Sequence, residues 1–392
     1  MSYITEKDQA FVAGTYGRFP VELTEGKGSV LFDTNGKKYV DLTSGIGVTA
    51  FGIADEKWKD AVVAQINKLQ HVSNLYYTEP CAVLAENLCL LTGMKKVFFG
   101  NSGAEANECA VKVARKYAQD KKGTDYGVIV TLKNSFHGRT LTTLAATGQD
   151  VFHTKFLPLT EGFVYAEANN FESVKKAVEE NKTAGVMIEC VQGEGGVIPL
   201  EEDFVKKVAE LCRKEDVVFI VDEVQTGNGR TGKPYAYMHY GVQPDVVTTA
   251  KGLGGGLPIG ACMMGEKVEK VLGKGDHGST FGGNPVACAG AITVVDRLTD
   301  DLMKEVSEKS KYVFETLKNA DGVESITGKG LMIGVKTVRP AREVVDECIE
   351  KGVLCLMAKD KVRLLPALNI PFDLLKEAVE TIKDVCKKTE VK

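Results

Sequence analysis

Val217-Val218-Phe219-Ile220-Val221-Asp222-Glu223-Val224-Gln225 is the segment from which the architecture of this chain follows. Its five leading apolar residues are rich in β-branched side chains and predict a strand buried on both faces, as in a parallel sheet. Ligands of such sheets bind beyond the carboxyl ends of the strands. Asp222 is therefore placed to hold a cationic ring nitrogen or a metal; the alternative is that it caps a following helix.

Apolar runs of the same kind recur on both sides of this segment. We expect buried strands at residues 97–99, 128–132, 186–191, 246–249 and 261–264. Between them lie amphipathic stretches with apolar residues at helical spacing, among them Ala106, Cys109, Ala110, Val113 and Tyr117. Short strands alternating with such helices predict an α/β fold with a mostly parallel central sheet.

Three units are expected along the chain. The large α/β domain is expected at residues 52–298. Residues 299–392 combine helical patterns with strands expected at 331–335, 354–357 and 362–365, which predicts a smaller α+β C-terminal domain. Residues 1–51 are expected to pack against that small domain, and they contain a predicted hairpin, residues 30–40, with its turn at Asn35-Gly36.

The composition excludes several classes of protein. Of 392 residues, 44% are hydrophobic and 26% charged, the net charge is −4, and no basic block is present, so we expect no nucleic-acid or membrane partner. The ten cysteines are scattered without a Cys-x-x-Cys pair, and the N-terminus lacks a signal-peptide pattern. We therefore expect a cytoplasmic protein without a metal site. His137 is expected to be structural. Glycine is in excess, at 41 residues, and is expected where backbone approaches a ligand.

The segment Phe99-Gly100-Asn101-Ser102-Gly103-Ala104-Glu105-Ala106-Asn107 joins an expected strand to an expected helix. Asn101 or Ser102 can cap the helix, and its free N–H groups, approached through Gly103, can form an anion site. A simple tight turn is the alternative.

Lys251 follows another expected strand and precedes a glycine-dense loop, Gly252-Leu253-Gly254-Gly255-Gly256. Lysine is seldom buried without a partner, and its depressible pKa makes it a nucleophilic amine for Schiff-base chemistry. A surface lysine is the alternative.

A third glycine-rich segment, Gly227-Asn228-Gly229-Arg230-Thr231-Gly232, matches the spacing of a dinucleotide-binding turn. Such a turn opens a helix and is followed by an acid that closes the next strand. Here Asp245 begins the next expected strand, so we do not expect nicotinamide binding.

The combination of Asp222, Lys251 29 residues later and an earlier phosphate-binding turn resembles the pyridoxal-phosphate enzymes of fold type I. The resemblance is greatest to the class III aminotransferases, in particular the acetylornithine and ornithine aminotransferase group, and extends from Tyr16 to Pro366. Its further motifs are Asn74-Leu75-Tyr76-Tyr77-Thr78, Phe136-His137-Gly138-Arg139-Thr140, Glu189-Cys190-Val191-Gln192-Gly193-Glu194-Gly195-Gly196 and His277-Gly278-Ser279-Thr280-Phe281-Gly282-Gly283-Asn284-Pro285.

The resemblance implies pyridoxal 5′-phosphate as cofactor and a homodimer with shared active sites. Ser102, Gly103 and Ala104 would hold the phosphate. Thr280, with Ser279 beside it, would complete that cradle from the neighbouring subunit.

The same resemblance assigns residues to the cofactor ring. Asp222 would pair with the ring nitrogen, and Phe136 and Val224 would pack on the two ring faces. Gln225 would bond near the phenolic oxygen. Lys251 would form the Schiff base and then carry a proton between substrate and cofactor.

Substrate recognition needs cations for carboxylates. Arg139 is expected to bind the α-carboxylate of a donor that reacts at its terminal amine, and Arg363 that of 2-oxoglutarate. Glu194 would mask Arg363 while the donor is bound, with a structural salt bridge as the alternative. Tyr16 and Glu189 are expected to line the same pocket.

Ile46 suggests which donor is used. Ornithine-specific relatives tend to carry tyrosine at the corresponding position, and an apolar residue leaves room for an acylated nitrogen. The resemblance thus implies transfer from N-acetylornithine to 2-oxoglutarate, a step of arginine biosynthesis. One departure is Gly52-Ile53-Ala54-Asp55-Glu56, where the family usually has Gly-His-x-His-Pro; we expect a change of local packing.

Other functions stay open. Ornithine, succinylornithine, succinyl-diaminopimelate and 4-aminobutyrate are alternative donors within the class. A non-catalytic nucleotide-binding protein on a similar sheet is the alternative from a different class.

Overall fold

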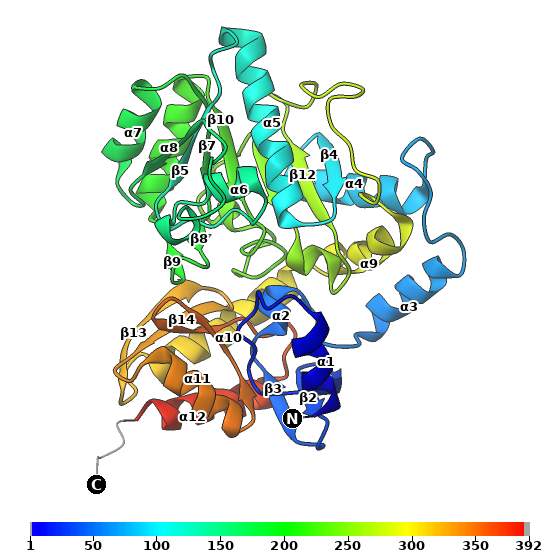
Figure 1. Cartoon of the computed structure of the whole chain (residues 1–392), viewed down its shortest axis with the longest axis vertical. Helices are drawn as coiled ribbons and strands as arrows, with labels where there is room; N and C mark the ends of the chain where they lie inside the picture. Colours follow the sequence, from blue (N-terminus) through cyan, green and yellow to red (C-terminus); the bar gives the residue numbers. More distant parts are fainter. Residues whose placement is uncertain (1, 388–392) are drawn as a thin grey trace.

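The strand β10 (Val218–Asp222) lies at the centre of a seven-stranded sheet, as its sequence predicts (Figure 1). The computed structural model describes residues 2–387. In order across the sheet, the strands are β4 (Lys96–Gly100), β12 (Gly260–Met264), β11 (Val246–Thr249), β10, β7 (Thr183–Ile188), β5 (Val128–Leu132) and β6 (Phe163–Ala166). Of these, β12 alone runs against the others. The predicted mostly parallel α/β sheet is confirmed, and β6 is an addition to the predicted strands.

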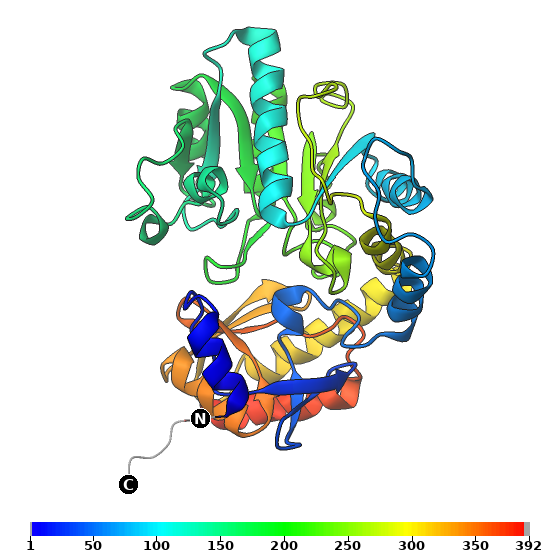
Figure 2. The same ribbon diagram turned by 45° about the vertical axis from the view of Figure 1, so that its right-hand side comes forward.

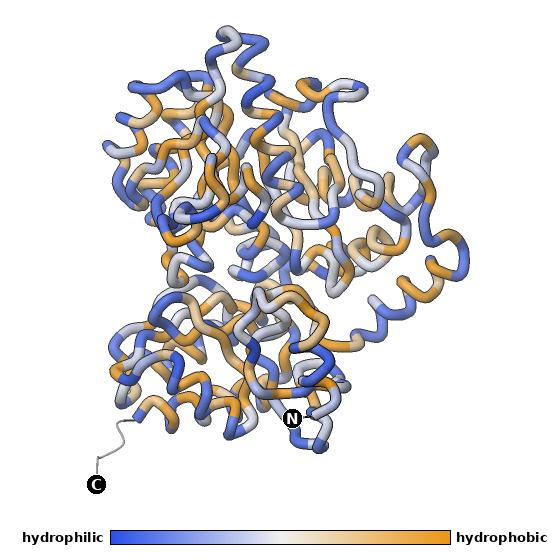
Figure 3. Tube along the Cα trace, viewed as in Figure 1, coloured by the Kyte–Doolittle hydropathy of each residue, from blue (hydrophilic) through white to orange (hydrophobic). Residues whose placement is uncertain are grey.

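Helices cover both faces of this sheet, which explains the continuous apolar run of β10. Val218 and Ile220 pack in one cluster with α5 (Gly103–Lys122), which lies against the sheet in Figure 2. Phe219 and Val221 belong to a second cluster. That cluster is shared with α4 (Glu79–Thr92), α7 (Phe171–Glu179), α8 (Glu202–Lys214) and α9 (Pro285–Val295). Figure 3 shows hydrophobic residues concentrated along these strands. Burying each such side chain contributes about 1.5–3 kcal/mol.

The lower part of Figure 1 combines both ends of the chain. One four-stranded sheet has the order β1 (Leu23–Lys27), β2 (Val30–Asp33), β3 (Lys38–Asp41) and β15 (Val353–Leu354). The other has the order β13 (Val323–Lys329), β14 (Met332–Thr337), β17 (Lys361–Leu364) and β16 (Leu356–Ala358). Three helices complete this part: α10 (Asp300–Leu317), α11 (Ala341–Glu350) and α12 (Phe372–Cys386). Tyr39, Val40 and Leu42 share one buried cluster with these helices. The domain boundaries at residues 52 and 298 stay a prediction.

The predicted hairpin is present, with a wider turn than Asn35-Gly36 alone. Residues 34–37 connect β2 to β3, and Gly36 has a φ of 77°. The Asp33 carboxylate accepts hydrogen bonds from the backbone N–H groups of Asn35 and Lys37, each at 2.9 Å. This side-chain cap stabilises the turn in place of a two-residue connection.

The remaining elements are short or lie at the edges of these two parts. They are α1 (Tyr3–Phe11), α2 (Ser44–Gly47), α3 (Glu56–Ile66), α6 (Leu141–Ala146), β8 (Val191–Gln192), β9 (Ile198–Pro199) and the 3₁₀ turns η1 (Asp150–Phe152), η2 (Ala236–His239) and η3 (Lys251–Gly254). At the segment that departs from the family motif, Asp55 caps α3 and forms an ion pair with Arg297 at 2.9 Å. Within residues 2–387, no helix is long and apolar enough to cross a membrane.

Candidate active site

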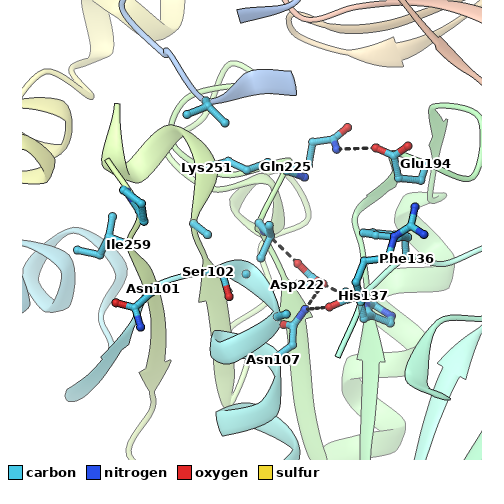
Figure 4. A pocket seen from close by; sticks show the side chains of 18 of the residues that line it. Asn101, Ser102, Asn107, Phe136, His137, Glu194, Asp222, Gln225, Lys251 and Ile259 are labelled. Carbon is cyan, nitrogen blue, oxygen red and sulfur yellow. Dashed lines mark hydrogen bonds and ion pairs between the residues drawn. The ribbon is translucent and has the colours of Figure 1, made fainter. Parts of the chain in front are cut away.

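A cavity of about 450 Å³ opens at the carboxyl ends of β4, β5, β7, β10 and β11 (Figure 4). Most of the residues singled out in the sequence line it: Ser102, Gly103, Ala104, Phe136, Arg139, Glu189, Glu194, Asp222, Val224, Gln225 and Lys251. Five loops that are far apart in the sequence therefore meet at one edge of the sheet, as expected for a parallel arrangement.

The turn after β4 forms an anion cradle. Ser102 is the N-cap of α5, and its Oγ accepts a hydrogen bond from the Glu105 N–H at 3.2 Å. The first N–H groups of a helix have no partner within that helix, so those of Gly103 and Ala104 can bind an anion. A Cβ on Gly103 would lie 2.6 Å from Val224, so glycine is required for this close approach.

Asp222 is the best-anchored group of the cavity. Its Oδ2 accepts hydrogen bonds from Asn107 Nδ2 at 2.8 Å and from His137 Nδ1 at 2.7 Å. Its Oδ1 accepts one from the Val224 N–H at 3.0 Å. Asn107 is itself fixed, because Thr248 Oγ1 donates to its Oδ1 at 2.7 Å. Asp222 therefore has a fixed orientation, with the carboxylate held in the floor of the cavity.

Two further titratable groups adjoin Asp222. Burial favours neutral His137, but the hydrogen bond and charge of Asp222 outweigh it and raise the pKa of His137 above its usual value. Burial raises the pKa of Glu189 to about 7, although His137 opposes the shift. The Glu189 carboxyl accepts hydrogen bonds from the N–H groups of Phe136 at 2.8 Å and Gly193 at 3.2 Å, so it holds the loop that carries Phe136.

Lys251 is held in a strained conformation directly after β11. Its φ is 45°, a region that residues other than glycine adopt rarely. Burial lowers the pKa of the Lys251 amine, and the charges of Glu194 and Asp222 offset part of that effect. A buried amine with a lowered pKa is a nucleophile and an acceptor of protons.

Glu194 and Arg363 form an ion pair at the same cavity. Arg363 Nη1 lies 2.5 Å from Glu194 Oε1, and Gln225 Nε2 donates to the same oxygen at 3.4 Å. Burial would raise the pKa of Glu194, but the charge and hydrogen bond of Arg363 bring it below its usual value, so the carboxylate stays charged.

Arg139 presents a second guanidinium to the cavity. It is exposed and lies over the rings of Phe152, at 4.5 Å, and Phe136, at 5.6 Å. No ion pair involves Arg139 within the part of the chain that the structure describes. Its charge is therefore available to a ligand.

Five of the singled-out residues lie outside the cavity lining. They are Tyr16, Ile46, Ser279, Thr280 and Arg363. Arg363 reaches the cavity through Glu194, and Ser279 Oγ accepts a hydrogen bond from Asn101, beside the anion cradle, at 3.2 Å. Thr280, Tyr16 and Ile46 are exposed.

The structure adds Asn107, Val48 and His137 as cavity residues. Asn107 is a polar residue on the buried face of α5, and that exception to the apolar pattern is a signal that could have found it. No comparable sequence signal marks Val48. His137 orients Asp222, which agrees with its expected structural role.

These groups fit pyridoxal phosphate. The helix N-terminus suits its phosphate, the oriented Asp222 suits a protonated ring nitrogen, and the buried Lys251 amine suits its aldehyde.

The raised pKa of His137 gives a testable pH dependence. A raised pKa in the folded chain adds stability that is fully present below about pH 6.5 and is lost as the pH rises through the folded pKa. We expect His137→Gln to destabilise the cofactor-free protein most near pH 5.5 and progressively less toward pH 9, measured by urea unfolding.

His239→Gln is the matched control, because the pKa of His239 is lowered to about 4, mainly by burial. It should show the opposite trend, with the stability lost on substitution growing as the pH rises. A loss in His137→Gln that did not change with pH would contradict the assignment.

Comparisons with known proteins agree with this geometry. The family model for aminotransferase class-III matches residues 11–386. Acetylornithine aminotransferase of Haemophilus ducreyi is 48% identical over 97% of this chain and 98% of its own length. The N-acetylornithine aminotransferase structure from Stenotrophomonas maltophilia has a TM-score of 0.83 and 34% identity, covering 94% of this chain and 96% of that one.

A structure of ornithine aminotransferase from Toxoplasma gondii, described as having partial occupancy of pyridoxal phosphate at its active site, has a TM-score of 0.93. Its identity is 30%, and the match covers 98% of this chain and 93% of that one. Because the family model and a 48% identical relative both match nearly the whole chain, the chain belongs to the class-III aminotransferases.

Proposed function

We propose that this chain is an N-acetylornithine:2-oxoglutarate aminotransferase of arginine biosynthesis. The observation that carries the proposal is the Glu194–Arg363 ion pair beside Lys251, in a cavity that also presents Arg139. One site can then take a donor with one carboxylate and an acceptor with two, according to whether Arg363 is masked. The names of the full-length relatives support the choice of substrate.

Pyridoxal phosphate, the cofactor of this family, supplies when bound an electron sink and a carrier for the amino group. We assign its phosphate to Ser102, Gly103 and Ala104 at the start of α5, with Ser279 nearby. We assign its ring nitrogen to Asp222, because three hydrogen-bond donors hold the Asp222 carboxylate in place.

The other residues at the ring are assigned from their places in the cavity. Phe136 and Val224 line it and would pack on the two ring faces, and Gln225 would bond near the phenolic oxygen. Lys251 Nζ would accept a proton from the amine-bearing carbon of the donor and pass it to the cofactor, and would carry a proton in the opposite direction when 2-oxoglutarate reacts. Its burial and lowered pKa suit that role.

The donor is positioned by its far end. We propose that Arg139 binds the α-carboxylate and so directs the terminal amine toward Lys251. Tyr16, Ile46 and Glu189 are proposed to line the path between them. Ile46 is apolar and half exposed, which suits an acylated nitrogen better than a free ammonium group.

The acceptor, 2-oxoglutarate, would bind Arg363, the cation that Glu194 masks. When 2-oxoglutarate enters, Glu194 swings away and Arg363 binds the α-carboxylate, while Arg139 remains for the distal one. The Glu194 side chain is partly exposed, at 31%, and that of Arg363 is buried, at 4%, so the carboxylate is the partner with more freedom to move.

A donor panel with 2-oxoglutarate as acceptor tests the proposal. We expect kcat/KM for N-acetylornithine to exceed that for ornithine, succinylornithine, succinyl-diaminopimelate and 4-aminobutyrate, with glutamate as product. A preference for unacylated ornithine would overturn the proposed substrate.

Lys251→Ala should abolish turnover and the borohydride-sensitive visible absorbance and keep the fold. Absence of that absorbance from the parent protein supplied with pyridoxal phosphate would favour the nucleotide-binding alternative.

Removing the Glu194 carboxylate should change the relative rates of the two amine donors. In Glu194→Ala, Arg363 is unmasked throughout, so we expect glutamate to react faster as an amine donor and N-acetylornithine more slowly. Single-turnover rates of the two half-reactions measure this. Glu167→Ala, which removes an exposed ion pair with Lys133, is the matched control and should change neither rate. Equal slowing of both donors in Glu194→Ala would indicate a structural salt bridge only.

We also propose a cytoplasmic homodimer. The ten cysteines are free, which suits a reducing compartment. Exposed apolar side chains lie on two adjoining loops, with Phe281 next to Thr280 on one and Leu75, Tyr76 and Tyr77 on the other. Asn74 joins these loops, because its Nδ2 donates hydrogen bonds to the carbonyls of Ser279 and Gly282. An exposed apolar surface of this kind is typical of one that a second subunit covers. At such an interface Thr280 would reach the phosphate site of that second subunit.

Phe281→Asp places a charge in this surface and should yield inactive monomers by sedimentation. Val338→Asp, at an exposed apolar position elsewhere, should remain dimeric and active. A fully active monomer of the parent chain would contradict the shared site.

A further inference from the structure

Arg230 lies in the glycine-rich turn whose spacing imitates a dinucleotide-binding motif, and the structure gives that turn a different use. Its side chain is 2% exposed. Nη1 donates hydrogen bonds to the carbonyls of Leu331, at 3.2 Å, and Pro366, and Nη2 donates to Ser44 Oγ at 3.4 Å. One guanidinium thus joins the turn after β10 to three other segments of the chain.

This cation is buried among neutral acceptors. Burial lowers the pKa of Arg230 to about 10, and Asp41, the nearby carboxylate, offsets part of that effect without forming a direct ion pair. Burying a charge without a direct partner is unfavourable, so hydrophobic packing alone does not explain an arginine at this position.

The segment that Arg230 reaches through Ser44 is strained. Ser44, Gly45, Ile46 and Gly47 all have positive φ, between 40° and 75°. A β-branched isoleucine is an outlier in this region, and such a conformation persists only where its surroundings enforce it. Asp41 Oδ1 accepts a hydrogen bond from the Ser44 N–H at 3.1 Å, and Ser44 Oγ donates to the Leu365 carbonyl at 2.5 Å. Arg230 completes this set of constraints.

The other two contacts bracket Arg363. Pro366 follows Arg363 in the chain, and Leu331 precedes β14, in which Gly334 pairs with Arg363. The turn that carries Arg230 is in turn fastened to the Lys251 strand, because Asn228 Nδ2 donates to Thr249 Oγ1 at 2.9 Å and to the Ala250 carbonyl at 3.3 Å.

We propose that Arg230 is a positioning residue that fixes the turn bearing Ile46 and the strand bearing Arg363 relative to Lys251. It touches no substrate and acts through the backbone of both segments. Three acceptors in different directions require the forked guanidinium, which a single ammonium group cannot replace. The proposal rests on the proposed function for the roles of Ile46 and Arg363.

The test is Arg230→Lys, with Ser44→Gly as a second variant that accepts the positive φ and removes the hydroxyl together with its hydrogen bonds to Arg230 and to the Leu365 carbonyl. We expect KM for both N-acetylornithine and 2-oxoglutarate to rise about tenfold in Arg230→Lys and about threefold in Ser44→Gly, with kcat within about twofold. In the cofactor-free protein, amide hydrogen exchange should accelerate at residues 43–48 and 363–368 and stay unchanged along α8.

Arg115→Lys is the matched control, because Arg115 also donates to two carbonyls, of Gly127 and Glu161, but away from the cavity. It should lower the Tm and leave both KM values unchanged. The same behaviour in Arg230→Lys, with unchanged exchange in the two segments, would overturn the positioning role. A parent enzyme that did not use N-acetylornithine would defeat the proposed function, and the exchange measurement would still decide whether Arg230 constrains these segments.

Discussion

The rest of the site depends on the hydrogen bonds that the buried carboxylate of Asp222 accepts. A carboxylate in a protein interior must be hydrogen-bonded, and here Asn107, His137 and a backbone N–H satisfy it from three directions. These donors come from α5, from the loop after β5 and from the turn after β10 itself. One buried charge therefore joins a helix, a loop and a turn at the cavity, and these segments carry Gly103, Phe136 and Val224.

Much of the fold was predictable because β10 and its neighbours are buried on both faces. Continuous apolar runs result from that burial, and they located β4, β5, β7, β11 and β12 to within a few residues. β6 was missed because it is an edge strand, mostly half buried, with a weaker apolar signal. α1 was missed for a related reason: none of its residues is buried, so it lacks the apolar periodicity on which helix prediction depends.

The site was predictable where chemistry requires a particular residue type at a strand end. Lys251, Asp222 and the Ser102 turn meet that condition, and the structure brings them to one cavity. Arg230 does not, because its importance depends on a partner, Ser44, that lies 186 residues away in the chain. The acceptors of this buried guanidinium are set by tertiary structure, and no local sequence pattern reveals them. The strain at Ile46 and Lys251 is likewise invisible in a one-dimensional pattern.

The reversed strand β12 has a consequence for the size of ligand that this fold can accept. It lies between β4 and β11, so the strands that lead to the anion cradle and to Lys251 are two strand spacings apart, roughly 10 Å. Gly260, at the start of β12, packs so tightly beneath the cradle that a Cβ there would lie 2.1 Å from the Ser102 carbonyl oxygen. The separation of these two strand ends is thus set by the hydrogen-bond repeat of the sheet, and substitutions in the loops do not change it. Substitutions in the loops can therefore reshape the surrounding cavity wall without changing the separation of the two strand ends that carry the cradle and Lys251.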